Sequence, residues 1–249
     1  MDIPLLTPEQ IEFFHREGYV LPIKVLDDTT LQALREEEER FRHGPNPLSG
    51  TFDVAGATSL FRSQVTNYSS PVREFGTRGP HLPLMQQLIA RDICLWFTQF
   101  VTKLPDGDAS RGEFSWHQDN GYIPVEPATN VTIWIALDDV NEENGCVYVQ
   151  PQSHKLGLLE HKKKSEDSWH LNVTVEGDGV PAILRAGEAV VFTGLTLHRS
   201  KFNRTDKPRR ALFLEYADLR GTIGVGGASV VQMPHVYVLS GAAPLATTE

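Results

Sequence analysis

The chain is poor in cysteine, and this excludes one class of protein at once. Its two cysteines, Cys94 and Cys146, are too few for a disulfide framework and do not form a Cys-x-x-Cys zinc pattern. We therefore expect both to be small buried residues. A disulfide-stapled secreted scaffold is excluded, so the fold must depend on a hydrophobic core.

Long hydrophobic runs and an excess of positive charge are also missing. No apolar run approaches the roughly 18 residues of a membrane span, and the N-terminus MDIPLLTPEQ lacks the basic start and apolar stretch of a secretory signal. With 23 Lys and Arg against 32 Asp and Glu, the net charge of −9 offers no basic surface to nucleic acid. We expect a cytoplasmic protein that binds neither membrane nor nucleic acid, and its oligomeric state is left open.

The composition is that of a globular protein, with 40% hydrophobic and 22% charged residues. We expect a single domain over residues 1–249, because the chain has no linker long enough to separate two domains and no internal repeat. Its parts would be a helical N-terminal region to about residue 90, a barrel over about 91–220 and a C-terminal extension over 221–249.

The helical signals lie near the N-terminus. Thr7-Pro8-Glu9-Gln10 has the form of a capping box with Pro at the first helical position, and Gly18 ends that helix. A second helix is expected from about Asp28 to just before Gly44, with Glu36 to Glu39 as its solvent-exposed face. A third is expected at about residues 82–90.

Beyond residue 90 the pattern becomes that of short strands rich in β-branched and aromatic residues. The expected strands are Ile93 to Thr102, Asn130 to Leu137, Cys146 to Gln150, Trp169 to Val175, Ala189 to Phe192 and Ala211 to Tyr216. Asn144-Gly145 predicts a hairpin turn between two of them. The fold class is therefore mainly β with flanking helices, a sandwich or a barrel.

The stretch FSWHQDNGY contains a candidate metal site. Residues i and i+2 of a strand project from one face, so His117 and Asp119 can point at one centre. His198 is the best third ligand, because it follows the buried-looking strand AVVFTGLTL, with Ser200 on the same face. Two His and one carboxylate form the arrangement of non-haem Fe(II) oxygenases, whereas an isolated His-x-Asp pair arises often by chance.

An arginine pair follows His198 and bears on a 2-oxoacid cosubstrate. The planar guanidinium pairs two-to-two with a carboxylate, so an arginine would suit the far carboxylate of such a molecule. Arg209 and Arg210 open an apolar strand and face opposite ways, so one of them should point inward. Strand parity alone does not choose between them.

These residues resemble the phytanoyl-CoA dioxygenase-like family of Fe(II)/2-oxoglutarate oxygenases over about Phe13 to Tyr216. The likeness consists of FFHREGY, a strand ending Thr102-Lys103-Leu104-Pro105, then WHQDNGY, TIWIALDD, NGCVYVQPQSHKLG and His-x-Ser with an Arg eleven residues after the His. The resemblance implies a double-stranded β-helix, which is a jelly-roll, cupin-like barrel.

The resemblance also implies roles for individual residues. The iron ligands would be His117, Asp119 and His198, and Arg209 would bind 2-oxoglutarate with Ser200, Trp134 and Gln99. A lysine of the family would fall near Arg62 to Gln64, where this chain has none. For the substrate, Tyr122, Gln64 and Asn67 are candidate contacts.

The implied cofactors are Fe(II), 2-oxoglutarate and O2, with succinate and CO2 released. Hydroxylation of a small molecule is the expected outcome; desaturation, cyclisation or epimerisation could follow the same chemistry. Asp119 argues against halogenation, because related halogenases have Ala or Gly in its place. The other function classes are a non-oxidative metal-binding hydrolase or isomerase and a silent binding module.

Overall fold

The computed structural model describes residues 5–43, 59–106, 112–163, 170–224, 228–229, 236–240 and 243–244. Its helices are α1 (Pro8–Glu17), α2 (Asp28–His43), α3 (Ser70–Arg78) and α4 (Leu82–Leu88), with 3-10 turns at Val65–Asn67, Asp119–Gly121 and Ser153–Leu156. In this part of the chain no helix has the length and apolar character needed to cross a membrane.

The large antiparallel sheet has the strand order β1-β11-β6-β13-β3-β16-β17, with β2 also paired to β3. Its strands are β1 (Tyr19–Lys24), β2 (Ser59–Ser63), β3 (Asp92–Lys103), β6 (Val131–Ala136), β11 (Glu188–Thr193), β13 (Arg209–Asp218), β16 (Tyr237–Ser240) and β17 (Ala243–Pro244). Within the C-terminal extension, β16 pairs with the first part of β3, with Tyr237 opposite Leu95.

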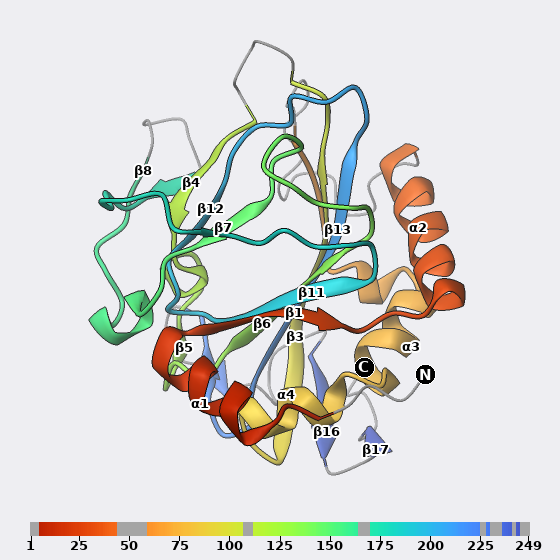
Figure 1. The fold of residues 1–249 in the computed structure, drawn as a ribbon. Helices are drawn as coiled ribbons and strands as arrows, with labels where there is room; N and C mark the ends of the chain where they lie inside the picture. The colour runs from red at the N-terminus through yellow and green to blue at the C-terminus, as the bar shows by residue number, and fades with distance from the viewer. Residues whose placement is uncertain are drawn as a thin grey trace.

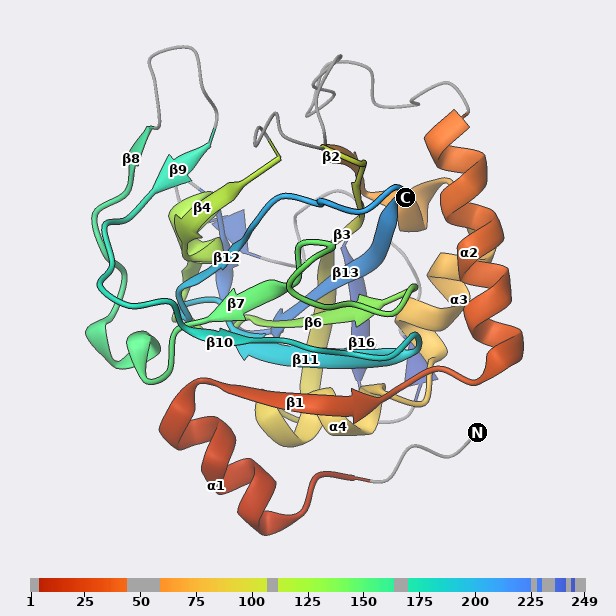
Figure 2. The same cartoon turned by 45° about the horizontal axis from the view of Figure 1, so that its top comes forward.

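A second sheet has the order β10-β7-β12-β4. Its strands are β4 (Phe114–His117), β7 (Val147–Val149), β10 (Val180–Pro181) and β12 (His198–Ser200). Two further small sheets contain β5 (Val125–Glu126), β14 (Thr222–Ile223) and β15 (Ala228–Ser229), and β8 (Lys162–Lys163) with β9 (Leu171–Asn172). Figures 1 and 2 show helices α1–α4 outside the large sheet and strands β4, β7 and β12 on its other side.

The two faces of the large sheet bury different cores. On β6, Ile133 and Ile135 pack outward with side chains of the helices, such as Phe14 and Leu34. Trp134 points inward and packs in a cluster with residues of the second sheet. This period-two alternation turns one face of each strand toward the barrel interior, where the site lies.

The expected mainly β fold with flanking helices is confirmed. The first helix has the expected capping box. The Thr7 hydroxyl oxygen accepts from the Gln10 backbone N–H, and the Gln10 side-chain oxygen accepts from the Thr7 backbone N–H. Gly18 ends it with φ 87°, a backbone conformation that glycine adopts at little cost. Cys94 and Cys146 are both free and buried, as expected.

Three local expectations were wrong. The region before residue 90 also contains β1, which pairs with β11 although its sequence YVLPIK includes Pro22. Glu38 is not on a solvent-exposed face, because it is 1% exposed and lies against β3. Asn144-Gly145 is a turn but not a hairpin, because β6 before it and β7 after it belong to different sheets.

Only part of another expected strand is seen. Trp169 lies outside the described residues, and of Trp169 to Val175 only Leu171–Asn172 is a strand. This segment therefore contributes a short pairing with β8 instead of a barrel strand.

Candidate metal centre

Three predicted ligands come together at one end of the barrel. His117 ends β4 and His198 begins β12, and these two residues face each other in the pairing of the two strands. Asp119 follows β4 at the start of a 3-10 turn. One ligand atom from each residue lies within 4.8 Å of the other two. Together they form the His-x-Asp…His triad.

Backbone carbonyls fix both imidazole rings. His117 Nδ1 lies 2.7 Å from the Ser115 carbonyl, and His198 Nδ1 lies 3.0 Å from the Thr196 carbonyl. A carbonyl only accepts, so each Nδ1 carries a hydrogen and each Nε2 is the nitrogen left to bind a metal. The two Nε2 atoms lie 3.9 and 3.4 Å from Asp119 Oδ1. This donor set, two imidazole nitrogens and a carboxylate, fits a divalent metal.

The three groups shift one another's protonation. Burial, and then the charge of His198, hold the pKa of His117 well below its usual value. Burial opposes the charged forms of the other two. Even so, the Asp119 carboxylate raises the pKa of His198, and His198 lowers the pKa of Asp119. Asp119 is thus ready to bind a cation, and its Oδ2 accepts from Thr132 Oγ1 at 2.9 Å.

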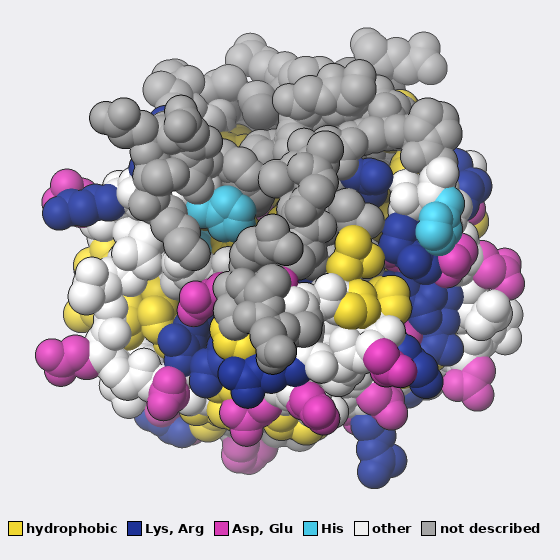
Figure 3. Space-filling model, turned by 90° about the horizontal axis from the view of Figure 1, so that it is seen from above, with side chains coloured by type: hydrophobic (Ala, Val, Ile, Leu, Met, Phe, Trp, Pro, Cys, Tyr) yellow, Lys and Arg dark blue, Asp and Glu magenta, His cyan; other side chains and the backbone are white. Residues whose placement is uncertain are grey.

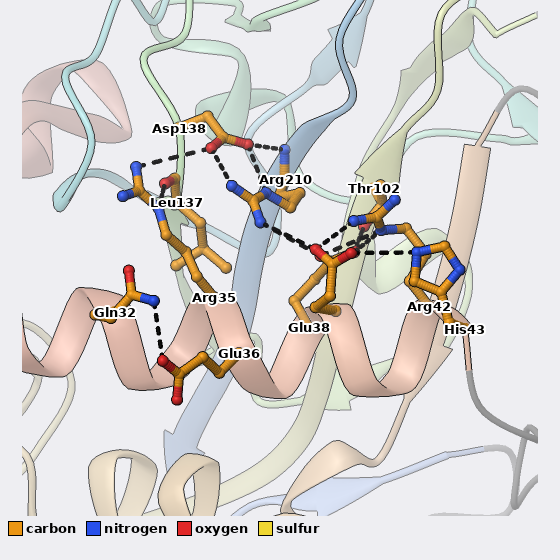
Figure 4. Close-up of polar contacts among 11 residues, drawn as sticks. Gln32, Arg35, Glu36, Glu38, Arg42, His43, Thr102, Leu137, Asp138 and Arg210 are labelled. Carbon is orange, nitrogen blue, oxygen red and sulfur yellow. Dashed lines mark hydrogen bonds and ion pairs between the residues drawn. The ribbon is translucent and has the colours of Figure 1, made fainter.

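The structure resolves which arginine points inward. Arg209 lies in the barrel and is 1% exposed. Arg210 is on the outside, where it donates to both Asp138 oxygens, at 2.9 and 2.7 Å, and its Nη1 reaches Glu38 of α2 at 3.9 Å. Figure 4 shows Arg210 between Asp138 and Glu38, above helix α2.

The Arg209 guanidinium is buried with few partners. Its Nη2 donates to the Gly145 carbonyl at 3.2 Å, and its central carbon lies 4.9 Å from the Trp134 ring centroid. Its Nε is buried and has no hydrogen-bond partner among the described residues. Burial lowers the pKa of Arg209 to about 10. A buried guanidinium with no carboxylate at ion-pair distance among the described residues fits a bound carboxylate.

Lys103 is a second buried cation that the sequence reasoning missed as a site residue. It lies opposite Arg209 in the β3–β13 pairing, and its Nζ donates to Ser200 Oγ at 2.8 Å and to the Lys201 carbonyl. Burial, and then Arg209, hold its pKa well below the usual value. The motif Thr102-Lys103-Leu104-Pro105 could have indicated it, because Lys103 is the last residue of the strand and its side chain points inward.

A cavity of about 360 Å³ connects these groups. It is lined by the triad and by Arg209, Ser200, Trp134, Gln99, Lys103 and Tyr122. Gln99 donates to Ser63 Oγ at 2.8 Å, and the Tyr122 hydroxyl accepts from the Leu171 amide at 2.9 Å. We call this cavity the chamber.

Gln64 and Asn67 are not among the residues that line the chamber. Gln64 precedes the 3-10 turn at Val65–Asn67 and donates to the Trp96 carbonyl at 3.1 Å. The Asn67 side chain accepts from the Tyr237 hydroxyl at 3.3 Å. These contacts are internal to the fold.

A β-bulge in β3 changes which side chains enter the chamber. Leu95 pairs with Tyr216 and Phe97 pairs with Glu215, so Trp96 is an extra residue between them. Both Trp96 and Phe97 consequently line the chamber, although they are adjacent in sequence. The residue pattern of this strand does not indicate a bulge.

Glu215 is a buried carboxyl group near the triad that the sequence reasoning also missed. It is 2% exposed, lines the chamber and accepts from Asn130 Nδ2. Burial, and then the charge of Asp119, raise the pKa of Glu215 well above its usual value. The Asn130 amide lies where a Cβ at position 194 would be, so Gly194 leaves the room that this side chain needs.

Comparison with known proteins decides the family. The model of the family described as "Phytanoyl-CoA dioxygenase (PhyH)" matches residues 14–211, which is most of the chain. The chain belongs to this family. It is therefore an Fe(II)/2-oxoglutarate-dependent dioxygenase, and Fe(II) and 2-oxoglutarate are its cofactor and cosubstrate.

The names of similar proteins refer to different reactions. The peroxisomal phytanoyl-CoA dioxygenase of Bos taurus is 25% identical over 236 residues, covering 86% of this chain and 69% of the relative. Methylphosphonate hydroxylase of Gimesia maris is 26% identical over 217 residues, covering 85% and 80%. The crystal structure of the epimerase SnoN, with Fe3+, α-ketoglutarate and nogalamycin RO, has a TM-score of 0.72 at 23% identity and covers 96% of this chain and 93% of SnoN.

Proposed function

We propose that this protein hydroxylates a small molecule, with release of succinate and CO2. The observation that carries the proposal is the triad of His117, Asp119 and His198 in one chamber with the buried, underpartnered Arg209. A hydrolase or isomerase would need the metal ligands alone, and a silent binding module would need neither.

We assign the iron to His117 Nε2, Asp119 and His198 Nε2. Bound there with 2-oxoglutarate, Fe(II) supplies the O2-dependent oxidation of the substrate. The carbonyl bonds at each Nδ1 hold the rings in the ligating orientation, and Thr132 holds the carboxylate. Three protein ligands would leave coordination positions of the iron for 2-oxoglutarate and O2.

We assign the far carboxylate of 2-oxoglutarate to Arg209, with Ser200 as a hydroxyl donor. Lys103 adds a second positive charge and orients Ser200 through the 2.8 Å contact between Nζ and Oγ. Trp134 lies against the guanidinium and would form a wall of the cosubstrate site. Gln99, which also lines the chamber, would contact the cosubstrate from β3.

Of the three candidate substrate contacts, Tyr122 has the best support. It lines the chamber, and its ring centroid lies 5.4 Å from that of His117. Gln64 and Asn67 would act on the substrate only indirectly, since both bond to other parts of the fold.

Anaerobic addition of Fe(II) and 2-oxoglutarate to metal-free protein tests the proposal. A visible charge-transfer band is expected, and it should be lost in His198→Ala and in Arg209→Ala. Arg210→Ala is the matched control, because Arg210 lies outside the barrel and should leave the band in place. The absence of a band from the unaltered protein would refute the assignment. Succinate release across a panel of metabolites would then identify the substrate.

A different outcome of the same oxidation is the second candidate. SnoN, which shares the fold, is named as an epimerase. Epimerisation, like desaturation or cyclisation, would start from the same hydrogen abstraction. Product analysis separates the outcomes, because hydroxylation adds the mass of one oxygen atom and the alternatives do not.

A further inference from the structure

Apart from its polar residues, the chamber has aromatic and aliphatic walls. Phe97 meets Phe213 edge-on at 5.9 Å between ring centroids, and Phe114 lies 6.3 Å from Tyr122. Ile123 also lines this space. Walls made of rings bury flat apolar surface efficiently, so they favour a ring-containing substrate.

The cations that line the chamber have other partners or roles, although the Nε of Arg199 is buried with no hydrogen-bond partner among the described residues. Lys103 and Arg209 lie at the end that we assign to 2-oxoglutarate. Arg199 pairs with Asp178 at 2.7 Å and lies 4.7 Å over the Trp116 ring. Among the described lining residues there is no further Lys or Arg. A phosphonate or another anionic substrate would therefore have to share a counter-charge with 2-oxoglutarate or with Asp178, which is costly.

The outer surface gives the same indication. On the face seen from above in Figure 3, acidic and basic side chains of the described residues lie intermixed. Recognition of the phosphates of a CoA thioester would require basic side chains gathered together. The molecule that enters the chamber should therefore be neutral.

Two polar atoms in these walls lack partners. Trp96 is 6% exposed, and its indole nitrogen is buried with no hydrogen-bond partner among the described residues. Glu215 receives one bond, from Asn130 to a single carboxyl oxygen, and its other oxygen has no partner in the described part of the chain. The two residues belong to neighbouring strands and both line the chamber, since Glu215 pairs with Phe97, the residue that follows Trp96.

We propose that Trp96 and Glu215 bind a hydroxyl group of a neutral, ring-containing substrate. A hydroxyl is the group that accepts one hydrogen bond, here from the indole N–H, and donates another, here to the carboxyl oxygen. A carboxyl oxygen can accept in either protonation state. The pair would fix which carbon of the ring system faces the triad. This assignment rests on the proposed oxygenase function, which makes the triad the place where the substrate reacts.

Equilibrium dialysis with three probes tests the assignment, on protein loaded anaerobically with Fe(II) and 2-oxoglutarate so that no turnover occurs. The probes are 2-naphthol, 2-methoxynaphthalene, which can accept but not donate, and naphthalene, which can do neither. We expect 2-naphthol to bind about tenfold more tightly than either analogue. Two buried hydrogen bonds favour 2-naphthol, and the greater hydrophobicity of the analogues offsets part of that advantage.

Two variants test the two proposed hydrogen bonds one at a time. Trp96→Phe keeps a ring but removes the donor, so the preference for 2-naphthol over naphthalene should fall to within about threefold. Glu215→Gln places an amide N–H where the acceptor was, so the preference over 2-methoxynaphthalene should disappear. Trp116→Phe and Glu38→Gln are matched controls outside the chamber and should keep both preferences. Circular dichroism establishes that each variant is folded.

Equal binding of the three probes, no binding of any of them, or preferences unchanged in Trp96→Phe and Glu215→Gln would each overturn the hydroxyl site. The oxygenase assignment fails by a separate observation. If the charge-transfer band is absent while the 2-naphthol preference and its loss in the variants persist, the proposed oxygenase function is wrong and the hydroxyl-binding pair is not.

Discussion

Arg209 and Arg210 are neighbours on β13 whose guanidinium groups lie on opposite sides of the large sheet. Arg209 lies in the barrel interior beside Trp134, and Arg210 bonds to Asp138 near helix α2. The same substitution at the two positions should therefore affect different properties of the protein.

Arg209→Lys should weaken 2-oxoglutarate binding by about 2 kcal/mol, roughly thirtyfold in Kd, because an ammonium cannot form the two-to-two contact with a carboxylate. Arg210→Lys should leave that Kd unchanged and lower the free energy of unfolding by about 1 kcal/mol, through loss of one of its bonds to Asp138. Titration of the charge-transfer band and urea denaturation measure the two effects. Equal effects of both variants on Kd would contradict the assignment.

Lys103→Met should raise the Kd for 2-oxoglutarate about tenfold by removing a buried positive charge. The pH dependence should change as well. Because burial and Arg209 lower the pKa of Lys103 in the free protein, binding of a carboxylate takes up a proton once the pH exceeds that lowered pKa.

Affinity for 2-oxoglutarate should therefore fall as the pH rises in the unaltered protein, and this trend should weaken in Lys103→Met. Binding measured by isothermal titration calorimetry in two buffers of different ionisation enthalpy reports the proton directly. No difference in proton uptake between the two proteins would exclude Lys103 from the cosubstrate site.

Thr132→Val should weaken Fe(II) binding about tenfold or more, because the hydroxyl that orients Asp119 is lost while the volume is kept. Anaerobic competition with a chelator measures the affinity. Thr222→Val is the control, since that hydroxyl donates to the Glu126 carbonyl and not to a residue of the triad. An unaltered Fe(II) affinity in Thr132→Val would show that the hydrogen bond from Thr132 to Asp119 does not contribute to metal binding.

His81 should make the protein sensitive to acid. Its Nε2 donates to the Tyr216 hydroxyl at 2.7 Å, since that hydroxyl donates its own hydrogen to the Gly76 carbonyl. The buried Nδ1 has no partner among the described residues, and burial lowers the pKa of His81 from 6.5 to about 3. The folded protein thus keeps this imidazole neutral, whereas the unfolded chain takes up a proton below pH 6.5.

Stability should consequently be full above pH 6.5 and fall by up to about 1.4 kcal/mol per pH unit as the pH decreases toward 3. His81→Gln should remove this contribution to the slope, and His43→Gln, at an exposed position, should keep it. Urea denaturation between pH 4.5 and 7.5, in steps of about one unit, compares the slopes. A slope that survives in His81→Gln would assign the acid sensitivity to other groups.

Much of the barrel was predictable because its signals are local. The capping box at Thr7 and the long alternating strands now seen as β3, β6, β11 and β13 are each specified by neighbouring residues. The strand β1 was missed because Pro22 argues against a strand, whereas here it stands at a register irregularity in the pairing with β11. Glu38 was misjudged because Glu36 and Glu39 of the same acidic run are exposed.

The site was predictable to the extent that its residues lie in motifs. The His-x-Asp pair and the distal His are such motifs, and the structure brings them together. Lys103 and Glu215 were missed because their positions depend on which strands pair, and so on contacts between residues about one hundred apart. The inward position of Arg209 was likewise open from parity and needed the register of β13.

The extra residue at Trp96 separates β3 into two halves that can change independently during evolution. From Phe97 onward the strand keeps its register with β13 and presents Gln99 and Lys103 to the cosubstrate end. At the bulge itself, gain or loss of one residue would change which of Trp96 and Phe97 reaches the chamber without shifting that register. A single strand can thus keep its contacts to the cosubstrate while the bulge alters its contacts to the substrate.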